Sequence, residues 1–295
     1  MLRRALVALA ILLIGACGPV STPSSSGDAP IAVLGAENFY ADLLAQIGGS
    51  RVTASSILSD PSADPHEYEA SPAAAKLVAD SKLVIVNGIG YDDFMEKLLG
   101  ASTKPDRVVI NAQDILGVKD DVNVHVWYDP GTMPKIAEVA TAALTKLDPD
   151  NAAYFREQEA KYLAVLKPLN DKIAALKARY AGAPIAFTEN VAGYQSEAIG
   201  LKILTPPEFM EAIESGTDPA PADVATERDL LTGRKVKALL YNSQVTSPLT
   251  EQIRELAIRS NVPVVPVAET IPKEFKTFQE WQLAQLDDLE RALAK

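Results

Sequence analysis

Apolar and polar positions alternate along this chain in a pattern typical of an α/β protein. Eight short runs rich in Val, Ile and Leu are almost continuously apolar, as expected for parallel strands buried on both faces. Stretches with helical periodicity separate them, which favours parallel sheets covered by helices. The expected strands are Ile31–Gly35, Val52–Ile57, Leu83–Asn87, Arg107–Ile110, Pro184–Thr188, Lys202–Leu204, Lys237–Asn242 and Pro263–Val267. The expected helices cover residues 37–48, 72–80, 91–99, 132–147, 223–232 and 248–260.

Residues 150–181 break this alternation, because they contain no strand-like run. Their apolar side chains recur every three or four residues and predict one buried stripe along a helix. Such a helix would be about 45 Å long, too long for a crossover inside one small domain, so we expect it to connect two domains. Pro168 lies within the segment and predicts a kink. The stripe consists of Tyr162, Leu166, Leu169, Ile173, Leu176 and Tyr180.

The N-terminus has the features of an export signal. Arg3 and Arg4 precede an apolar stretch, residues 5–16, that is too short to span a hydrocarbon core of about 30 Å. The sequence IGAC at residues 14–17 resembles a bacterial lipobox, in which the cysteine thiol receives diacylglycerol. We therefore expect a signal peptide over residues 1–16, lipidation of Cys17 and a flexible tether over residues 17–30. An ordinary secretory signal with an incidental cysteine is the alternative.

These segments leave an N-terminal lobe (31–149), a linking helix (150–181) and a C-terminal lobe (182–295). A length of 295 residues and an apolar content of 47% agree with two globular domains. The net charge of −11 and the lack of a basic cluster argue against nucleic acid or an anionic lipid surface as partner, so membrane contact is expected only through the N-terminal lipid. A single cysteine permits no disulfide within the chain, and we expect a monomer.

The two histidines of the chain both lie in polar, turn-like segments beside a carboxylate, a proline and an aromatic ring. Asp64 is close to His66 and Asp129 is close to His125, and a carboxylate is a group that can orient a metal-bound imidazole. Each histidine is therefore a candidate metal ligand, with a solvated or structural imidazole as the simpler alternative. The motifs HExxH, CxxC, GxSxG and the acidic calcium loop are absent, and the glycines near residue 88 do not complete a dinucleotide fingerprint.

Two motifs resemble segments of the metal-binding receptors of zinc and manganese ABC importers. Residues 64–72 read DPHEYEASP and resemble the family segment DPHxYExSP. Residues 125–130 read HVWYDP and resemble the segment HxWxDP. The sequence VNGIGYD at residues 86–92 and the closing Trp-containing helix also fit this family, so the resemblance covers roughly residues 31–295.

The resemblance implies two α/β lobes with parallel-rich sheets flanked by helices, joined by one long rigid helix, with a metal ion in the cleft between them. The two histidine ligands of the N-terminal lobe correspond to His66 and His125. The third ligand follows the first strand of the second lobe and corresponds to Glu189. The fourth comes late in the chain and corresponds to Glu269, where the family usually has aspartate. The function implied is an extracytoplasmic, lipid-anchored binding protein, not an enzyme, that delivers Mn²⁺ or Zn²⁺ to an ABC permease.

Imidazole and carboxylate ligands suit Zn²⁺, Mn²⁺ or Fe²⁺, and the lack of a sulfur ligand argues against Cu⁺. Glutamate at the third position, where zinc receptors commonly have histidine, favours Mn²⁺. The Irving–Williams order favours Zn²⁺ for any one ligand set, so the sequence leaves the metal open. Protonation of the two histidines should release it.

Three other functions fit parts of the sequence. A metal-dependent extracytoplasmic hydrolase would need a general base near the metal, and Glu67 or Glu69 is the candidate. A metal-linked surface adhesin is compatible with the resemblance. A receptor for an organic anion would need Arg or Lys in its cleft.

Overall fold

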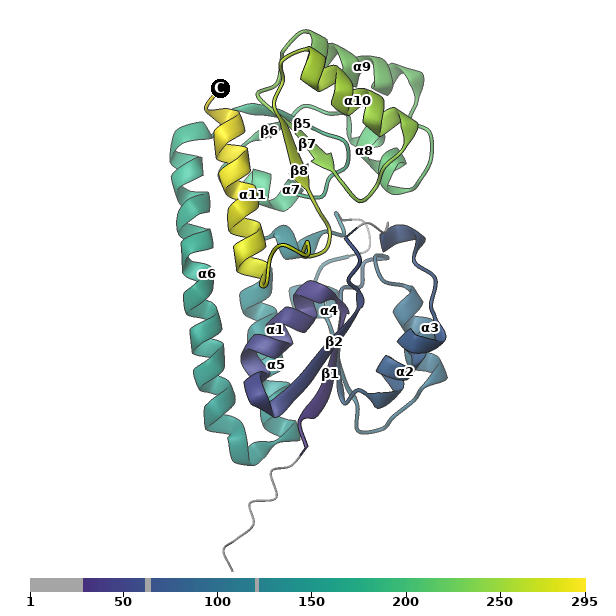
Figure 1. Cartoon of the computed structure of the whole chain (residues 1–295), viewed down its shortest axis with the longest axis vertical. Helices are drawn as coiled ribbons and strands as arrows, with labels where there is room; N and C mark the ends of the chain where they lie inside the picture. The colour runs from purple at the N-terminus through teal and green to yellow at the C-terminus, as the bar shows by residue number, and fades with distance from the viewer. Residues whose placement is uncertain (1–28, 62–64, 120–121) are drawn as a thin grey trace, which may run out of the picture.

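Two four-stranded parallel sheets form the framework of the chain, whose computed structural model describes residues 29–61, 65–119 and 122–295 (Figure 1). Their strand orders are β2-β1-β3-β4 and β6-β5-β7-β8, so both sheets follow the same connectivity. All eight expected strands are present, with ends within two residues of those expected. The strands are β1 (Ile31–Glu37), β2 (Val52–Leu58), β3 (Leu83–Val86), β4 (Val108–Asn111), β5 (Pro184–Phe187), β6 (Lys202–Ile203), β7 (Leu239–Asn242) and β8 (Val264–Val267).

Helices cover both faces of the first sheet. Alternate residues of its strands point to opposite faces, so Leu83 and Ile85 of β3 join the large core while Val84 and Val86 join a smaller cluster with Val78. All four residues of β3 are buried, which explains why this strand is continuously apolar. The helices of this half are α1 (Asn38–Gly48), α2 (Pro72–Asp80), α3 (Phe94–Ala101), α4 (Ala112–Leu116) and α5 (Thr132–Leu147).

The hydrophobic pattern indicates three short helices poorly or not at all: α4 in the first half, and α7 (Gly193–Ile199) and α8 (Pro207–Glu214) in the second. α4, α7 and α8 are 5, 7 and 8 residues long, too short to display the repeated apolar stripe by which longer helices are found. Short 3-10 turns, Gly49–Arg51, Pro65–Glu67, Val126–Tyr128 and Pro149–Asn151, complete the first half. The remaining helices are α7 (Gly193–Ile199), α8 (Pro207–Glu214), α9 (Pro221–Thr232), α10 (Pro248–Arg259) and α11 (Phe278–Leu293).

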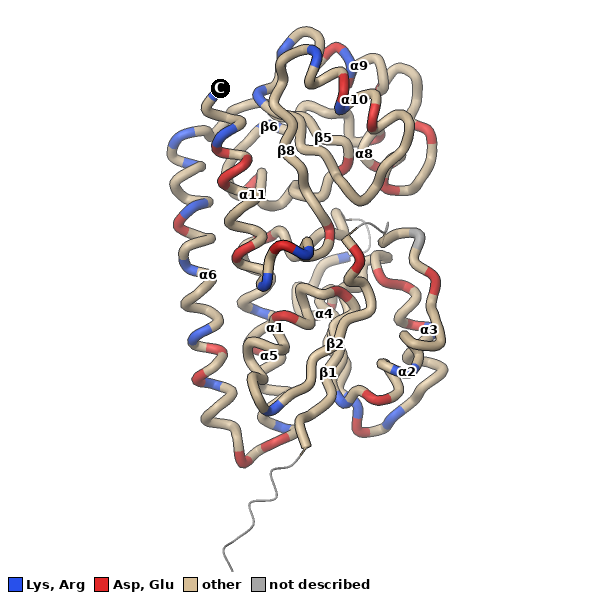
Figure 2. Tube along the Cα trace, in the orientation of Figure 1, with Lys and Arg blue, Asp and Glu red and all other residues tan. Residues whose placement is uncertain are grey.

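Helix α6 (Ala152–Tyr180) joins the two halves and runs alongside both of them (Figure 1). It remains one continuous helix of 29 residues through Pro168. The expected stripe is buried apart from Tyr180, which is half-buried against the core. Positively and negatively charged residues are interspersed along α6 (Figure 2). The C-terminal helix α11 packs beside α6, and Lys172 of α6 pairs with Asp287 and Glu290 at 2.5 and 2.6 Å.

The two halves also touch directly. The Asn38 side chain exchanges two hydrogen bonds with the backbone of Ile271, at 2.9 and 3.0 Å. The Tyr128 hydroxyl donates to the Ala268 carbonyl at 2.7 Å. These contacts hold the carboxyl ends of the two sheets against each other. Within the described ranges, no helix combines the length and apolar character needed to cross a bilayer.

Candidate metal centre

Four side chains singled out in the sequence converge where the two sheets face each other. Their ligand-type atoms all lie within 4.8 Å of one another, the one such group among the described residues. Three of the side chains are fully buried, and that of His66 is 17% exposed. The structure therefore brings together the residues that the sequence predicts as metal ligands. They are His66, His125, Glu189 and Glu269.

The distances within this group suit a small cation at its centre. His66 Nε2 lies 3.4 Å from Glu189 Oε1 and 3.3 Å from Glu269 Oε2. His125 Nε2 lies 3.6 Å from Glu189 Oε1 and 3.3 Å from Glu269 Oε2. Metal–ligand bonds of about 2.0–2.1 Å in a tetrahedron would separate neighbouring ligand atoms by about 3.3–3.4 Å. These four separations are thus close to four of the six edges of a tetrahedral zinc site.

Each lobe contributes two of these side chains. His66 lies in the 3-10 turn that follows β2, and His125 immediately precedes another 3-10 turn. Glu189 and Glu269 each lie two residues beyond the end of a strand, β5 and β8 respectively. The carboxyl ends of parallel strands meet at one edge of a sheet, where open α/β sheets commonly bind ligands. The topology therefore explains how residues far apart in sequence meet.

A hydrogen bond fixes the orientation of the His125 ring. Its Nδ1 lies 2.7 Å from Asn123 Oδ1, and since an amide oxygen only accepts, Nδ1 carries the proton and Nε2 is available to a metal. The expectation that Asp129 holds this imidazole is wrong, because its carboxylate accepts from the backbone N–H of Gly131 and caps a turn. Asp64, expected to play that part for His66, lies outside the described residues.

Two side chains that the sequence did not single out hold the carboxylates. Asn242 Nδ2 donates to Glu189 Oε2 at 2.6 Å and to Glu269 Oε1 at 2.7 Å. The Tyr91 hydroxyl of the first lobe donates to Glu269 Oε2 at 3.0 Å. Glu269 therefore contacts both histidines, Asn242 and Tyr91.

A constrained turn positions Tyr91. Ile89 has a φ of 60°, which is unusual for a β-branched residue and is the kind of strain that accompanies functional sites. The carboxylate of Asp92 accepts the backbone N–H groups of Asn87 and Gly88 at 2.7 and 2.8 Å, which holds the turn in place. Burial of Asp92 raises the pKa of its carboxyl to about 6 in spite of these bonds.

Burial and neighbouring charges shift the pKa values of three of the four side chains. Burial lowers the pKa of the His66 imidazole, but the carboxylates of Glu189 and Glu269 outweigh burial and raise that pKa to about 11. Burial and the neighbouring Glu269 charge raise the pKa of Glu189. Burial also acts to raise the pKa of Glu269, but the two histidines outweigh it and lower that pKa. Without a metal, a protonated His66 thus supplies the positive charge that the carboxylates require.

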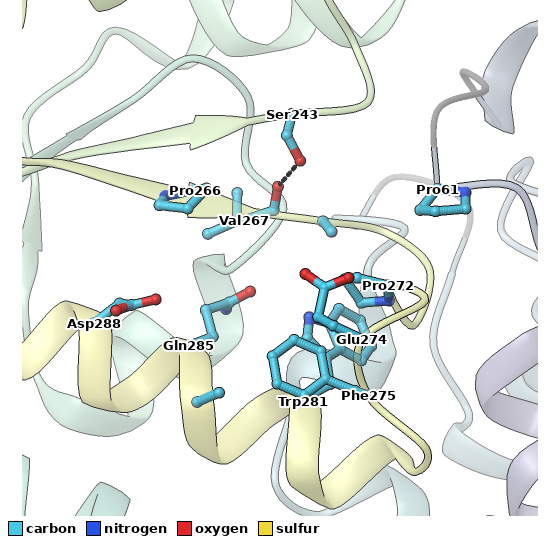
Figure 3. A pocket seen from close by; sticks show the side chains of 12 residues that line it. Pro61, Ser243, Pro266, Val267, Pro272, Glu274, Phe275, Trp281, Gln285 and Asp288 are labelled. Atoms are coloured by element: carbon cyan, nitrogen blue, oxygen red, sulfur yellow. Dashed lines mark hydrogen bonds between the residues drawn. The ribbon is translucent and has the colours of Figure 1, made fainter.

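A cavity of about 330 Å³ lies beside this centre without being part of it (Figure 3). Its wall includes Ala268, the neighbour of Glu269, but none of the four candidate ligands lines it. Figure 3 shows Trp281 and Gln285 of α11 on one side and Ser243 on another. The candidate metal centre is therefore a packed group of side chains rather than an open pocket.

Comparison with known proteins gives consistent matches. The family model described as "Zinc-uptake complex component A periplasmic" matches residues 33–292. The manganese-binding lipoprotein MntA of Halalkalibacterium halodurans is 28% identical over 202 residues, 66% of each chain. The high-affinity zinc uptake system protein ZnuA of Bacillus subtilis is 23% identical over 289 residues, 91% of this chain and 88% of that protein. The solved structure of the periplasmic zinc-binding protein TroA from Treponema pallidum has a TM-score of 0.74 at 17% identity, covering 90% of this chain and 99% of that one.

Proposed function

The chain belongs to the periplasmic zinc-uptake complex component A family, and from this premise we propose that it captures a divalent transition metal ion between its lobes for delivery to an ABC importer. Curated relatives are named as a manganese-binding lipoprotein and a zinc uptake system protein, which supports Mn²⁺ or Zn²⁺ as cargo, with Fe²⁺ also compatible with the donor set. The family consists of solute-binding proteins, so the hydrolase alternative is not favoured. The two buried carboxylates also disfavour an organic anion, since they would repel it.

The observation that carries the proposal is the convergence of two imidazoles and two carboxylates on a space the size of one cation. Two carboxylates balance the charge of a divalent ion, which makes burial of that ion electrostatically acceptable. We propose His66, His125, Glu189 and Glu269 as the ligands, each bound through the atom that faces the centre of the group. Because each lobe supplies two ligands, bound metal would add a link between lobes that already share direct hydrogen bonds.

Titration calorimetry of the metal-stripped protein with Zn²⁺ and Mn²⁺ tests this proposal. We expect one equivalent of metal to bind and at least one proton to be released near neutral pH. The reason is that His66, with a pKa of about 11, carries a proton that the metal must displace. Below that pKa the proton competes more strongly as the pH falls, so affinity should drop about tenfold per pH unit for each proton displaced.

Buffers of different ionisation enthalpy give the number of protons released. A His66→Gln variant lacks the titrating imidazole, so it should bind metal more weakly and release fewer protons. Affinity that stays constant between about pH 8 and about pH 5 would contradict histidine ligation. No bound metal under any of these conditions would contradict the proposed function itself.

We further propose that the mature protein is a monomer anchored to the outer face of the cell membrane through Cys17, which lies outside the described residues. The lipobox-like sequence before Cys17 and the naming of relatives as lipoproteins support this. Mass spectrometry of the mature N-terminus should find a diacylglyceryl group on Cys17, and Cys17→Ser should release protein that binds metal with unchanged affinity. An unmodified cysteine on the mature chain would overturn the anchor.

A further inference from the structure

Asn242 bridges the two carboxylates of the candidate metal centre. It is the last residue of β7, between the two strands that precede Glu189 and Glu269, and it is fully buried. Its side-chain amide has two N–H donors, and one goes to each carboxylate, at 2.6 and 2.7 Å. Hydrogen bonds of this length to ionised carboxylates are among the strong ones in proteins.

Two further hydrogen bonds of Asn242 fix the orientation of its side-chain amide. Its Oδ1 accepts the backbone N–H of Gln244 at 3.0 Å, so rotating the amide by half a turn would break that bond as well as both bonds to carboxylates. Its own backbone N–H donates to Thr188 Oγ1 at 3.0 Å, next to Glu189 in the chain. The orientation of the two donors is thus determined by the surrounding network.

This arrangement divides the oxygens of each carboxylate into two roles. Glu189 Oε2 and Glu269 Oε1 face Asn242. Glu189 Oε1 and Glu269 Oε2 face the two histidines. For the second oxygen of either carboxylate also to reach the metal, the carboxylate must rotate, and that rotation would strain or break its hydrogen bond to Asn242. The donor therefore opposes two-oxygen binding by either residue.

We propose that Asn242 is a positioning residue that restricts both glutamates to one metal-facing oxygen each and thereby biases the centre toward zinc over manganese. The inference rests on the proposed function, because it assigns a coordination number to the same site. Two nitrogens and two oxygens make four donors, the number that zinc prefers. Manganese belongs with the ions bound by six donors rich in oxygen, which this centre would offer only if both carboxylates turned. Asn242 thus counteracts the bias toward manganese that a glutamate at position 189 suggests.

The test is an Asn242→Ala variant loaded with Zn²⁺, Mn²⁺ or Co²⁺. Removing the donors frees both carboxylates, so the ratio of zinc to manganese affinity should fall by about tenfold, the lower end of the loss in affinity for a single metal when groups behind its ligands are removed. The visible spectrum of bound Co²⁺ reports geometry directly. We expect intense tetrahedral bands in the parent protein and weak bands, typical of higher coordination, in the variant.

Asn87→Ala is the matched control. Asn87 directly follows β3 in the first lobe and is also fully buried, but its amide bonds to the Val124 carbonyl and to Tyr40 rather than to a carboxylate. Loss of a buried asparagine by itself should lower both metal affinities together and leave their ratio and the Co²⁺ spectrum unchanged. An equal change of the ratio in both variants would overturn the inference.

X-ray absorption of the Zn²⁺- and Co²⁺-loaded parent protein keeps the inference testable if Asn242→Ala fails to fold. Four donor atoms around the metal support it. Five or six donors in the parent protein would overturn the role of Asn242 and leave the proposed function standing. Failure of the parent protein to bind any of the three ions would overturn both.

Discussion

A Glu269→Gln variant is expected to fold but to bind metal more than about 100-fold more weakly, beyond the 10- to 100-fold loss typical of groups behind the ligands. Glu269 Oε2 lies 3.3 Å from both histidine Nε2 atoms, and Glu269 Oε1 accepts from Asn242. Glutamine keeps the shape of the side chain and removes one of the two negative charges that balance a divalent ion. An incompletely balanced charge is costly in a fully buried site.

Rotation of the glutamine amide cannot easily restore the lost metal affinity, because both of its orientations conflict with the hydrogen-bond pattern of the site. If the glutamine oxygen faces Asn242, the NH₂ group takes the metal-facing position, and an amide nitrogen that carries two hydrogens offers no lone pair for coordination. If the amide rotates, its NH₂ group faces the NH₂ group of Asn242, and two donors confront each other in a buried site. Neither orientation restores the fourth ligand without leaving a buried polar group unsatisfied.

Glu227→Gln is the matched control for this variant. Glu227 lies on α9, is also fully buried in the second lobe, and burial raises the pKa of its carboxyl to about 7. It is not among the convergent side chains, so its replacement should leave the affinity unchanged in competition with a chelator of known affinity. Comparable losses in the two variants would mean that Glu269 acts through stability rather than as a ligand.

The candidate ligands could be predicted because their signals are local. His66 and His125 lie in short motifs whose neighbouring prolines and aromatic residues are adjacent in sequence. Glu189 and Glu269 follow apolar runs that are recognisable as strands, and parallel strands bring their carboxyl ends to one edge. Burial helps to explain the prediction of the strands: β3 is buried throughout and continuously apolar, and β1 and β5 are mostly buried, whereas β2 and β6 are only partly buried.

The groups that hold these ligands could not be predicted in this way. The sequence favours Asp129 as the partner of His125, because a carboxylate commonly orients a metal-bound imidazole. The bond from His125 to Asn123 and the turn that engages Asp129 depend on the three-dimensional structure. Asn242 reaches two carboxylates that are 53 and 27 residues away in the chain. Tyr91 donates across the lobes to a residue 178 positions later. Such contacts depend on how the strands are ordered and how the lobes meet, neither of which the sequence pattern specifies.

Replacing Trp127 with alanine is expected to destabilise the metal-free protein by about 3–5 kcal/mol, the usual cost of removing a large aromatic side chain from a core. Trp127 is 1% exposed and stacks on Phe39 of α1 with ring centroids 4.5 Å apart. Its ring also packs against Tyr91 and His125, at 4.9 and 5.2 Å. Urea unfolding followed by circular dichroism measures the loss, and a value below about 1 kcal/mol would show that the surrounding residues close the cavity.

Comparison with Trp281→Ala separates the contribution of Trp127 to stability from its contribution to metal binding. Trp281 is 2% exposed and packs against Tyr128 and Phe278, so its removal should cost a similar free energy of unfolding. Of these two tryptophans, Trp127 is the one that contacts the ring of His125, so its removal alone should also weaken metal binding, by about tenfold or more. Equal metal affinities in the two variants would mean that the hydrogen bond from Asn123 alone orients His125. A selective loss in Trp127→Ala would mean that the aromatic wall is needed as well, because it keeps the ring from turning away when the metal is absent.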